Sequence, residues 1–222
     1  MAAVVLGLII VALAGLHLLA VWFAESFDIE VLQSWFDLDG EQTLPTWFAS
    51  VQLLAVGILL ARIAKTDAES SIRRMAGIVA VALVFFSIDE VAAIHESITG
   101  ILERFSWVPR FSGEHGIWIF VYAGLAVAAS PFALPGWWEM LRRTPLHALG
   151  LAAGAATFFF GGVGVEIASY FGGGSVVMEE TLEMAGVALM LVTSLAILEE
   201  TEGDGTKGPG TVHGESSTTP PG

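Results

Sequence analysis

The sequence predicts an all-α integral membrane protein, a bundle of six transmembrane helices with both termini in the cytoplasm. Of the 222 residues 55% are hydrophobic and only 14% are charged, whereas an ordinary soluble domain has about 25% charged residues. Six apolar segments approach the roughly 20 residues that a helix needs to cross a hydrocarbon core of about 30 Å. Lys and Arg gather in alternate loops, which predicts the orientation.

The expected spans follow one another in order: residues 2–23, 47–63, 75–95, 116–134, 147–171 and 176–198. The first segment lacks a basic region, and its apolar run exceeds the roughly 7 to 15 residues usual in a signal peptide. We therefore interpret it as a retained first helix.

The orientation follows from the loops after the second and fourth spans. These two loops carry most of the nine basic residues: Arg62, Lys65, Arg73, Arg74, Arg142 and Arg143. Cytoplasmic loops of membrane proteins are enriched in Lys and Arg. The sequence thus predicts a multi-pass protein of the plasma (cytoplasmic) membrane, whose other loops face the extracytoplasmic side.

Two polar segments flank the spans. Residues 24–46 form an acidic outer loop without Lys or Arg, and apolar residues at helical spacing in 29–36 predict a short interfacial helix there. Residues 199–222 are polar and rich in Gly, Pro, Ser and Thr. Such a segment buries too little apolar surface to order itself, so we expect a disordered cytoplasmic tail.

The segment 87–96 carries four ionisable residues at the end of an apolar helix. Asp89, Glu90, His95 and Glu96 fall within eight positions, and such groups at a bilayer edge cost free energy unless they are paired, hydrated or bound to a cation. On a continuous helix Asp89 and Glu96 share a face, while Glu90 and His95 point away from it in opposite directions. All four can bind one ion only if the helix ends or unwinds near Ile94.

Further ionisable residues are expected on the same side of the membrane. Apart from boundary residues such as Arg62 and His147, every ionisable residue inside an expected span falls in its outer half. This convergence favours a single outward-facing site. Its additional candidates are His17, Glu114, His115, Glu166, Glu179, Glu180 and Glu183.

One interpretation of these residues is a site for a divalent metal ion. Asp, Glu and His without Cys suit Zn²⁺, Mn²⁺ or iron, and a cation relieves the repulsion among carboxylates. The expected ligands are Asp89, His95, Glu96 and Glu183. Glu166 or Glu180 is the expected catalytic base, in hydrolytic or redox chemistry on a lipid or an extracytoplasmic small molecule. Glu90, His17, His115, Glu114 and Glu179 are additional candidates.

Three other interpretations remain open. A proton- or cation-coupled transporter would use Asp89 and Glu166 as its titrating groups, although the inner halves of the spans are almost purely apolar. An accessory subunit would dock a membrane partner or a second copy through the small-residue faces of spans five and six, where Gly150 and Gly154 stand four apart. Carboxylates such as Glu179 and Glu180 also fit ordinary solvated positions at a helix N-terminus.

Composition excludes several classes of function. The chain has no cysteine, which rules out disulfides, thiolate metal sites and iron–sulfur clusters. Its net charge of −14 argues against nucleic acid, because phosphate binding needs clustered Lys and Arg. The expected surroundings are the lipid bilayer.

The outward cluster of Asp, Glu and His resembles the sites of membrane zinc hydrolases related to alkaline ceramidases. That resemblance implies zinc chemistry on a lipid. The chain departs from those enzymes because it has six expected spans rather than seven and lacks their His-x-x-x-His pair on a late helix. Membership in that family therefore does not follow.

Overall fold

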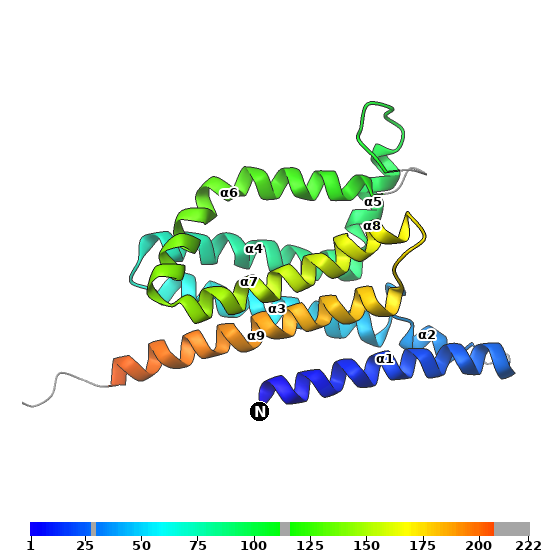
Figure 1. Cartoon of the computed structure of the whole chain (residues 1–222), viewed down its shortest axis with the longest axis horizontal. Coiled ribbons are helices and arrows are strands. Elements are labelled where there is room, and N and C mark those ends of the chain that lie inside the picture. The colour runs from blue at the N-terminus through cyan, green and yellow to red at the C-terminus, as the bar shows by residue number, and fades with distance from the viewer. Residues whose placement is uncertain (28–29, 112–115, 207–222) are drawn as a thin grey trace, which may run out of the picture.

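The protein is a bundle of helices, shown in Figure 1. The computed structural model describes residues 1–27, 30–111 and 116–206, and every regular element in those ranges is helical. Six of the helices are long and apolar enough to cross a membrane. The multi-pass, all-α architecture predicted from the sequence is thereby confirmed.

The helices keep the predicted order but differ at their ends. The long ones are α1 (Ala2–Phe27), α3 (Leu44–Thr66), α4 (Ser70–Ala92), α6 (Ile117–Arg143) and α9 (Val176–Thr206). The fifth span combines α7 (Pro145–Phe159), a π-helical turn η1 (Phe160–Val165) and α8 (Glu166–Ser169). Two short helices, α2 (Gln33–Phe36) and α5 (Ile94–Leu102), lie at the end where the candidate residues gather.

Two boundaries differ most from the sequence prediction. Helix α6 runs nine residues past the expected end at 134, because Pro131 and Pro135 bend it without ending it (Figure 1). Helix α9 continues through residues 199–206, which the sequence predicts to be disordered tail. Glu200 there approaches His147 of α7, with 3.5 Å between Oε1 and Nε2. Residues 207–222 of the predicted tail lie outside the described residues.

Helices α3 and α4 pack against each other along most of their length. Near one end the Ser50 hydroxyl donates to the Ser87 carbonyl at 2.8 Å, and the Ser87 hydroxyl donates to the Ser50 carbonyl at 2.9 Å. Further along, Gly57 lies so close to α4 that a Cβ there would be 2.9 Å from Val84. These paired hydroxyls and the small residue let the two backbones approach closely. Helices α3 and α4 together support the candidate site.

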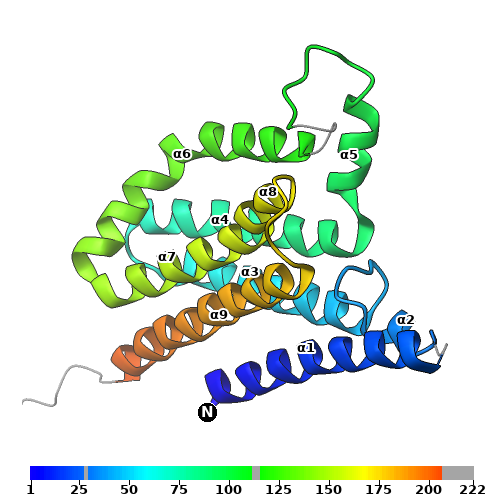
Figure 2. The ribbon, with the colours of Figure 1, turned by 45° about the vertical axis from the view of Figure 1, so that its right-hand side comes forward.

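Helices α7 and α9 make the second close pair. A Cβ on Gly186 would lie 2.6 Å from the carbonyl oxygen of Gly154, and one on Gly150 would lie 2.7 Å from the Thr193 hydroxyl. The small-residue faces of the fifth and sixth spans therefore pack against each other inside this chain. Helix α1 lies beside α9 at the edge of the bundle, as Figures 1 and 2 both show.

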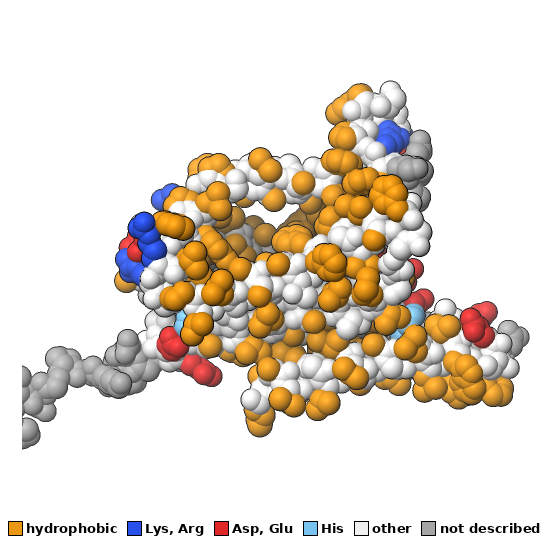
Figure 3. Space-filling model, in the orientation of Figure 1, with side chains coloured by type: hydrophobic (Ala, Val, Ile, Leu, Met, Phe, Trp, Pro, Cys, Tyr) orange, Lys and Arg blue, Asp and Glu red, His pale blue; other side chains and the backbone are white. Residues whose placement is uncertain are grey.

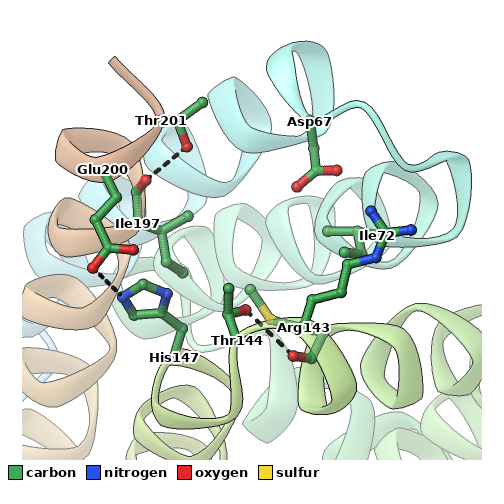
Figure 4. A pocket seen from close by; sticks show the side chains of 9 residues that line it. Asp67, Ile72, Arg143, Thr144, His147, Ile197, Glu200 and Thr201 are labelled. Carbon is green, nitrogen blue, oxygen red and sulfur yellow. Dashed lines mark hydrogen bonds and ion pairs between the residues drawn. The ribbon is translucent and has the colours of Figure 1, made fainter. Parts of the chain in front are cut away.

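The two ends of the bundle differ in charge. Figure 3 shows most of the visible Lys and Arg at the end that holds the α6–α7 turn and a smaller basic group above the opposite end, while Asp, Glu and His appear at both ends. At the α6–α7 end Arg143 pairs with Glu69 at 3.0 Å and with Glu139 at 2.5 Å. The same end has a small pocket into which His147, Glu200 and Arg143 point (Figure 4). In this pocket His147 pairs with Glu200, and Arg143 pairs with Glu69 and Glu139 outside it, so we place the candidate site at the other end.

Candidate functional site

The site begins where α4 ends. Ala93 adopts a left-handed conformation with φ 46° and ψ 46°, which breaks the expected continuous span 75–95 into α4 and α5. The Asp89 carboxylate then accepts the backbone N–H of His95 at 2.8 Å, in the first turn of α5. It thus takes the place of a capping side chain and satisfies an N–H that the helix leaves unpaired.

This break changes which residues share a face. From the sequence, the four groups can meet only if the helix ends near Ile94, and α4 ends at Ala92, with the break at Ala93. His95 turns back so that its Nδ1 lies 3.2 Å from Asp89 Oδ1. Glu96, expected on the Asp89 stripe of a continuous helix, is instead an exposed residue of α5 beyond the break.

Asp89 has a third partner on α6. The Tyr122 hydroxyl donates to Asp89 Oδ2 at 3.0 Å. Asp89 is 6% exposed, and a buried carboxylate needs such donors to offset its lost hydration. The three hydrogen bonds place Asp89 between α4, α5 and α6 and hold the His95 ring in one orientation.

Glu41, from the loop between α2 and α3, completes a group around His95. Glu41, His95 and Glu96 each offer a ligand atom, and these atoms all lie within 4.8 Å of one another. Glu41 Oε2 is buried and has no hydrogen-bond partner among the described residues. Two carboxylates and one imidazole, drawn from two segments, therefore converge at one point.

The geometry of this group suits a small divalent cation after a modest contraction. Four ligand atoms about 2.1 Å from a tetrahedral ion lie about 3.4 Å from one another. Rotation of the exposed Glu96 side chain is the simplest way to tighten the group, since Glu96 has room to move. His95 Nδ1 is occupied by Asp89, so Nε2 remains for an ion, as in a carboxylate–histidine–metal arrangement.

Electrostatics make the group attractive to a cation. Burial lowers the pKa of His95, but the hydrogen bond to Asp89 and the charges of Asp89, Glu41 and Glu96 outweigh it and raise that pKa above its ordinary value. Burial, followed by the charges of Glu96 and Asp89, raises the pKa of Glu41, and His95 opposes this only in part. Because a metal ion binds the deprotonated forms of these groups, their raised pKa values couple metal binding to pH.

A second carboxylate, Glu166, lies close to this group. The Trp118 indole N–H donates to Glu166 Oε1 at 3.3 Å, and the Tyr170 hydroxyl donates to the same oxygen. The Trp118 ring also contacts the rings of His95 and Tyr122, with centroids 5.5 and 5.4 Å away. Trp118 thus connects the Glu166 carboxylate to the His95 group.

A third set of carboxylates lies between α4 and α9. The charges of Glu90, Glu180 and Glu183 interact with one another, and all three side chains are half-buried. Glu183 packs on the π-helical turn, where a Cβ on Gly162 would come within 2.5 Å of Glu183 Oε1. Single π-helical turns are frequent at functional sites, and here the turn makes room for a carboxylate.

The remaining candidates are His17, Glu179, Glu114 and His115. His17 fixes the loop after α2, since its Nδ1 accepts the Leu38 N–H at 3.1 Å. A nitrogen that accepts this bond carries no proton, so its 3.6 Å approach to Asp37 is not an ion pair. Glu179 begins α9 within electrostatic reach of Glu166. Glu114 and His115 lie outside the described residues.

The sequence analysis missed Glu41, Tyr122 and Tyr170. Glu41 was one of several acids in a loop, and nothing local distinguishes it. The tyrosines did leave a signal, because the chain has only two and both donate to candidate carboxylates. Trp118 stands four residues, one helical turn, before Tyr122, and this spacing places both aromatic side chains on one face of α6.

Fold and site together define a class: a multi-pass membrane protein of six apolar helices with a carboxylate–histidine group at one end. The model of a family described as a domain of unknown function (DUF8692) matches residues 2–198, and the chain belongs to that family. No curated protein and no solved structure matches the chain.

Proposed function

We propose that the protein is a membrane metalloprotein that binds one divalent cation, Zn²⁺, Mn²⁺ or Fe²⁺, through Glu41, His95 and Glu96. The observation that supports this most is the approach of their ligand atoms to within 4.8 Å of one another. Asp89, expected as a ligand from the sequence, takes the role of orienting His95. Glu183 lies in a separate carboxylate set and is left out of this ligand group.

The chemistry that we propose is hydrolytic or redox and acts on a lipid or an extracytoplasmic small molecule. A divalent ion in such a site polarises a substrate oxygen or lowers the pKa of a bound water. Glu166, held by Trp118 and Tyr170 next to the His95 ring, is the carboxylate best placed to accept a proton. Glu180 is the second candidate for that base.

We further propose that the chain resides in the plasma (cytoplasmic) membrane with this site on the extracytoplasmic side. The concentration of Arg at the opposite end of the bundle supports this orientation (Figure 3). Binding of a membrane partner or of a second copy of the chain also stays a prediction. Because Gly150 and Gly154 already face α9, such a partner would use another face.

The metal proposal is tested by elemental analysis. We would purify the protein without chelator or polyhistidine tag and measure metal by plasma mass spectrometry. His95→Ala and Glu96→Gln are expected to lose the metal. Glu103→Gln, the same change at an exposed glutamate on the same end, is expected to keep it. Equal metal content in all four proteins, or none in any, would refute the ligand assignment.

A second candidate function is proton- or cation-coupled transport. The observation that favours it is the Glu90, Glu180 and Glu183 set between α4 and α9. On α3, which packs against α4 and α9, Gln52 is 3% exposed and neither of its amide atoms has a partner among the described residues. Buried polar groups of this kind are typical of ion pathways.

Transport is tested in proteoliposomes that contain a pH-sensitive dye. An imposed proton gradient or membrane potential should collapse faster with the wild type than with Glu183→Gln, and Glu103→Gln should behave as the wild type. If the gradient decays no faster than in protein-free vesicles, and no cation moves, transport is excluded and the metal proposal stands alone.

A further inference from the structure

Helix α6 separates from the bundle over part of its length. Residues 123–128 are all exposed. At 100° per residue, six consecutive residues cover the whole circumference of a helix, so no face of α6 is packed at this level against the part of the chain that the structure describes. The space-filling view in Figure 3 shows the consequence, an opening between α6 and the helices beneath it.

The opening is bounded at both ends. At one end the Phe86 ring contacts Tyr122 of α6 and Phe159 of α7, with centroids 5.8 and 6.2 Å away. At the other end α6 returns to the bundle, where a Cβ on Gly136 would meet the carbonyl oxygen of Ser71 at 2.2 Å. The face of α6 over the opening continues from Tyr122 through Ala126 to Ala129, which are spaced four and three residues apart.

The depth and chemistry of the opening match lipid hydrocarbon. Tyr122 and Ala129 lie about 8 and 18 Å along α6 from Ile117 at 1.5 Å per residue, inside a hydrocarbon core of about 30 Å. No charged residue occurs in the facing segments 76–88, 122–132 and 151–160. The hydroxyl groups of these segments already donate to carbonyl or carboxylate oxygens of the chain, so the opening suits a hydrocarbon chain better than water.

The polar site adjoins the outer end of the opening. Tyr122 contributes its ring to the aromatic wall and its hydroxyl to Asp89, so the apolar opening and the His95 group are separated by one side chain. An occupant with an aliphatic tail and a polar head would place the tail beside Ala126 and the head beside Asp89 and His95.

We infer that the opening admits the acyl chain of a membrane lipid, whose head group is then the substrate part presented to the carboxylate–histidine site. This inference rests on the proposed function and specifies its substrate class, an amphiphile that enters laterally from the bilayer. A water-soluble substrate would reach the exposed Glu96 from outside and would leave the opening without an occupant.

A helix from a second copy fits the opening less well. Helices with side chains are about 10 to 12 Å across, whereas the stretch of α6 whose residues are all exposed, 123–128, is only about 8 Å long at 1.5 Å per residue. A flexible acyl chain needs less room than a helix and fits such an opening more readily.

The test is photocrosslinking in vesicles. The wild type is reconstituted in 1-palmitoyl-2-oleoyl-phosphatidylcholine that contains a small fraction of phosphatidylcholine with a diazirine in its acyl chain. After irradiation, adducts are mapped by mass spectrometry. We expect adducts on the half-buried Phe86 and Tyr122 as well as on the lipid-facing Val81 and Val127, which are 72% and 71% exposed.

Two matched variants locate the entry route. Ala126→Trp fills the opening, and Ala128→Trp places the same side chain at nearly the same depth but about 200° around the helix. Adducts on Phe86 and Tyr122 should fall about tenfold or more in Ala126→Trp, because an indole occupies the space that the chain needs. They should stay at the wild-type level in Ala128→Trp.

Two results would overturn the inference: wild-type adducts confined to Val81 and Val127, or equal adduct yields on Phe86 in the two variants. The wild-type map needs no variant to fold, and Ala126→Phe is the milder substitute for Ala126→Trp. Metal content is measured on the same samples. If metal is bound but Phe86 and Tyr122 carry no adducts, this inference alone is overturned. If no metal is bound but the expected adducts form, the metal function is refuted and the binding of a lipid chain in the opening still holds.

Discussion

Both tyrosines of the chain donate their hydroxyl to a candidate carboxylate, Tyr122 to Asp89 and Tyr170 to Glu166. A tyrosine at a bilayer interface is ordinarily explained by its amphipathic ring alone. Here the hydroxyls also hold two acidic side chains in defined places at one end of the bundle. Burial, followed by the hydrogen bond and charge of Glu166, raises the pKa of Tyr170, so this residue stays a donor at any physiological pH.

The raised pKa of His95 predicts how metal binding depends on pH. An imidazole must lose its proton to bind a metal, and that of His95 keeps its proton to a higher pH than the ordinary value of about 6.5. Zn²⁺ affinity, measured by equilibrium dialysis from pH 6 to 8, should therefore increase with pH. An affinity that does not change over this range would contradict His95 as a ligand.

The stability of the metal-free protein depends on pH in the opposite direction, so the contribution of His95 decreases as the pH rises. Because the pKa of His95 is higher in the folded state, its protonation stabilises the fold. That contribution is fully present below the unfolded value of about 6.5 and is lost as the pH rises through the folded value.

At the scale of single elements, the break at Ala93 is the feature on which the site depends. An L-residue in the left-handed region costs about 1 to 2 kcal/mol, and glycine avoids most of that cost. Ala93→Gly should thus increase the free energy of unfolding by up to about 1 kcal/mol. The increase is measured as a higher thermal unfolding midpoint in detergent. Ala92→Gly, one residue earlier and at the last residue of α4, should lower the free energy of unfolding, by at most about 0.5 to 1 kcal/mol. Equal effects of both changes would mean that the break is not at Ala93.

The α7–α9 pair makes a second prediction at this scale. A Cβ on Gly186 would come within 2.4 Å of the Phe158 backbone nitrogen, and backbone atoms cannot rotate away. Gly186→Ala should therefore destabilise the protein by about 1 to 3 kcal/mol. Gly15→Ala on α1 is the control, since no atom of the described residues lies within 4 Å of its added Cβ. Comparable midpoints for the two variants would contradict this close helix contact.

The elements themselves were largely predictable from the sequence, because an apolar run of about 20 residues has few alternatives to a spanning helix. The six spans were found for that reason, whereas the helical spacing of apolar residues in 29–36 indicated a short helix, which the structure has as α2 at Gln33–Phe36. The continuation of α6 beyond Pro135 and of α9 beyond residue 198 was missed. In α6 the prolines bend the helix without ending it. In α9 the apolar segment ends before the helix does.

At the scale of the whole molecule, the site was predictable only in part. The sequence indicated that Asp89, His95 and Glu166 belong to one end, because they share a depth in the membrane. It did not indicate that Glu41 from the outer loop joins His95, since a contact between distant segments leaves no local pattern. The pairing of Asp89 with His95 depended on a helix break that involves neither Gly nor Pro.

Orientation is a prediction for the whole molecule, and the absence of cysteine makes it simple to test. Single cysteines at Gln42→Cys and Glu199→Cys, both at exposed positions, provide one label site at each end of the bundle. A membrane-impermeant maleimide added to intact cells should label the cysteine at 42 and not the one at 199. The reverse pattern would place the carboxylate–histidine site on the cytoplasmic side.

X-ray absorption at the zinc edge tests the central claim most directly, on zinc-loaded and untagged protein. We predict nitrogen and oxygen ligands at about 2.0 to 2.1 Å, with the outer-shell scattering of one imidazole. That imidazole signal should disappear in His95→Ala and persist in His147→Ala, a histidine at the opposite end of the bundle. A spectrum without imidazole, or one that His95→Ala leaves unchanged, would contradict a metal centre built on Glu41, His95 and Glu96.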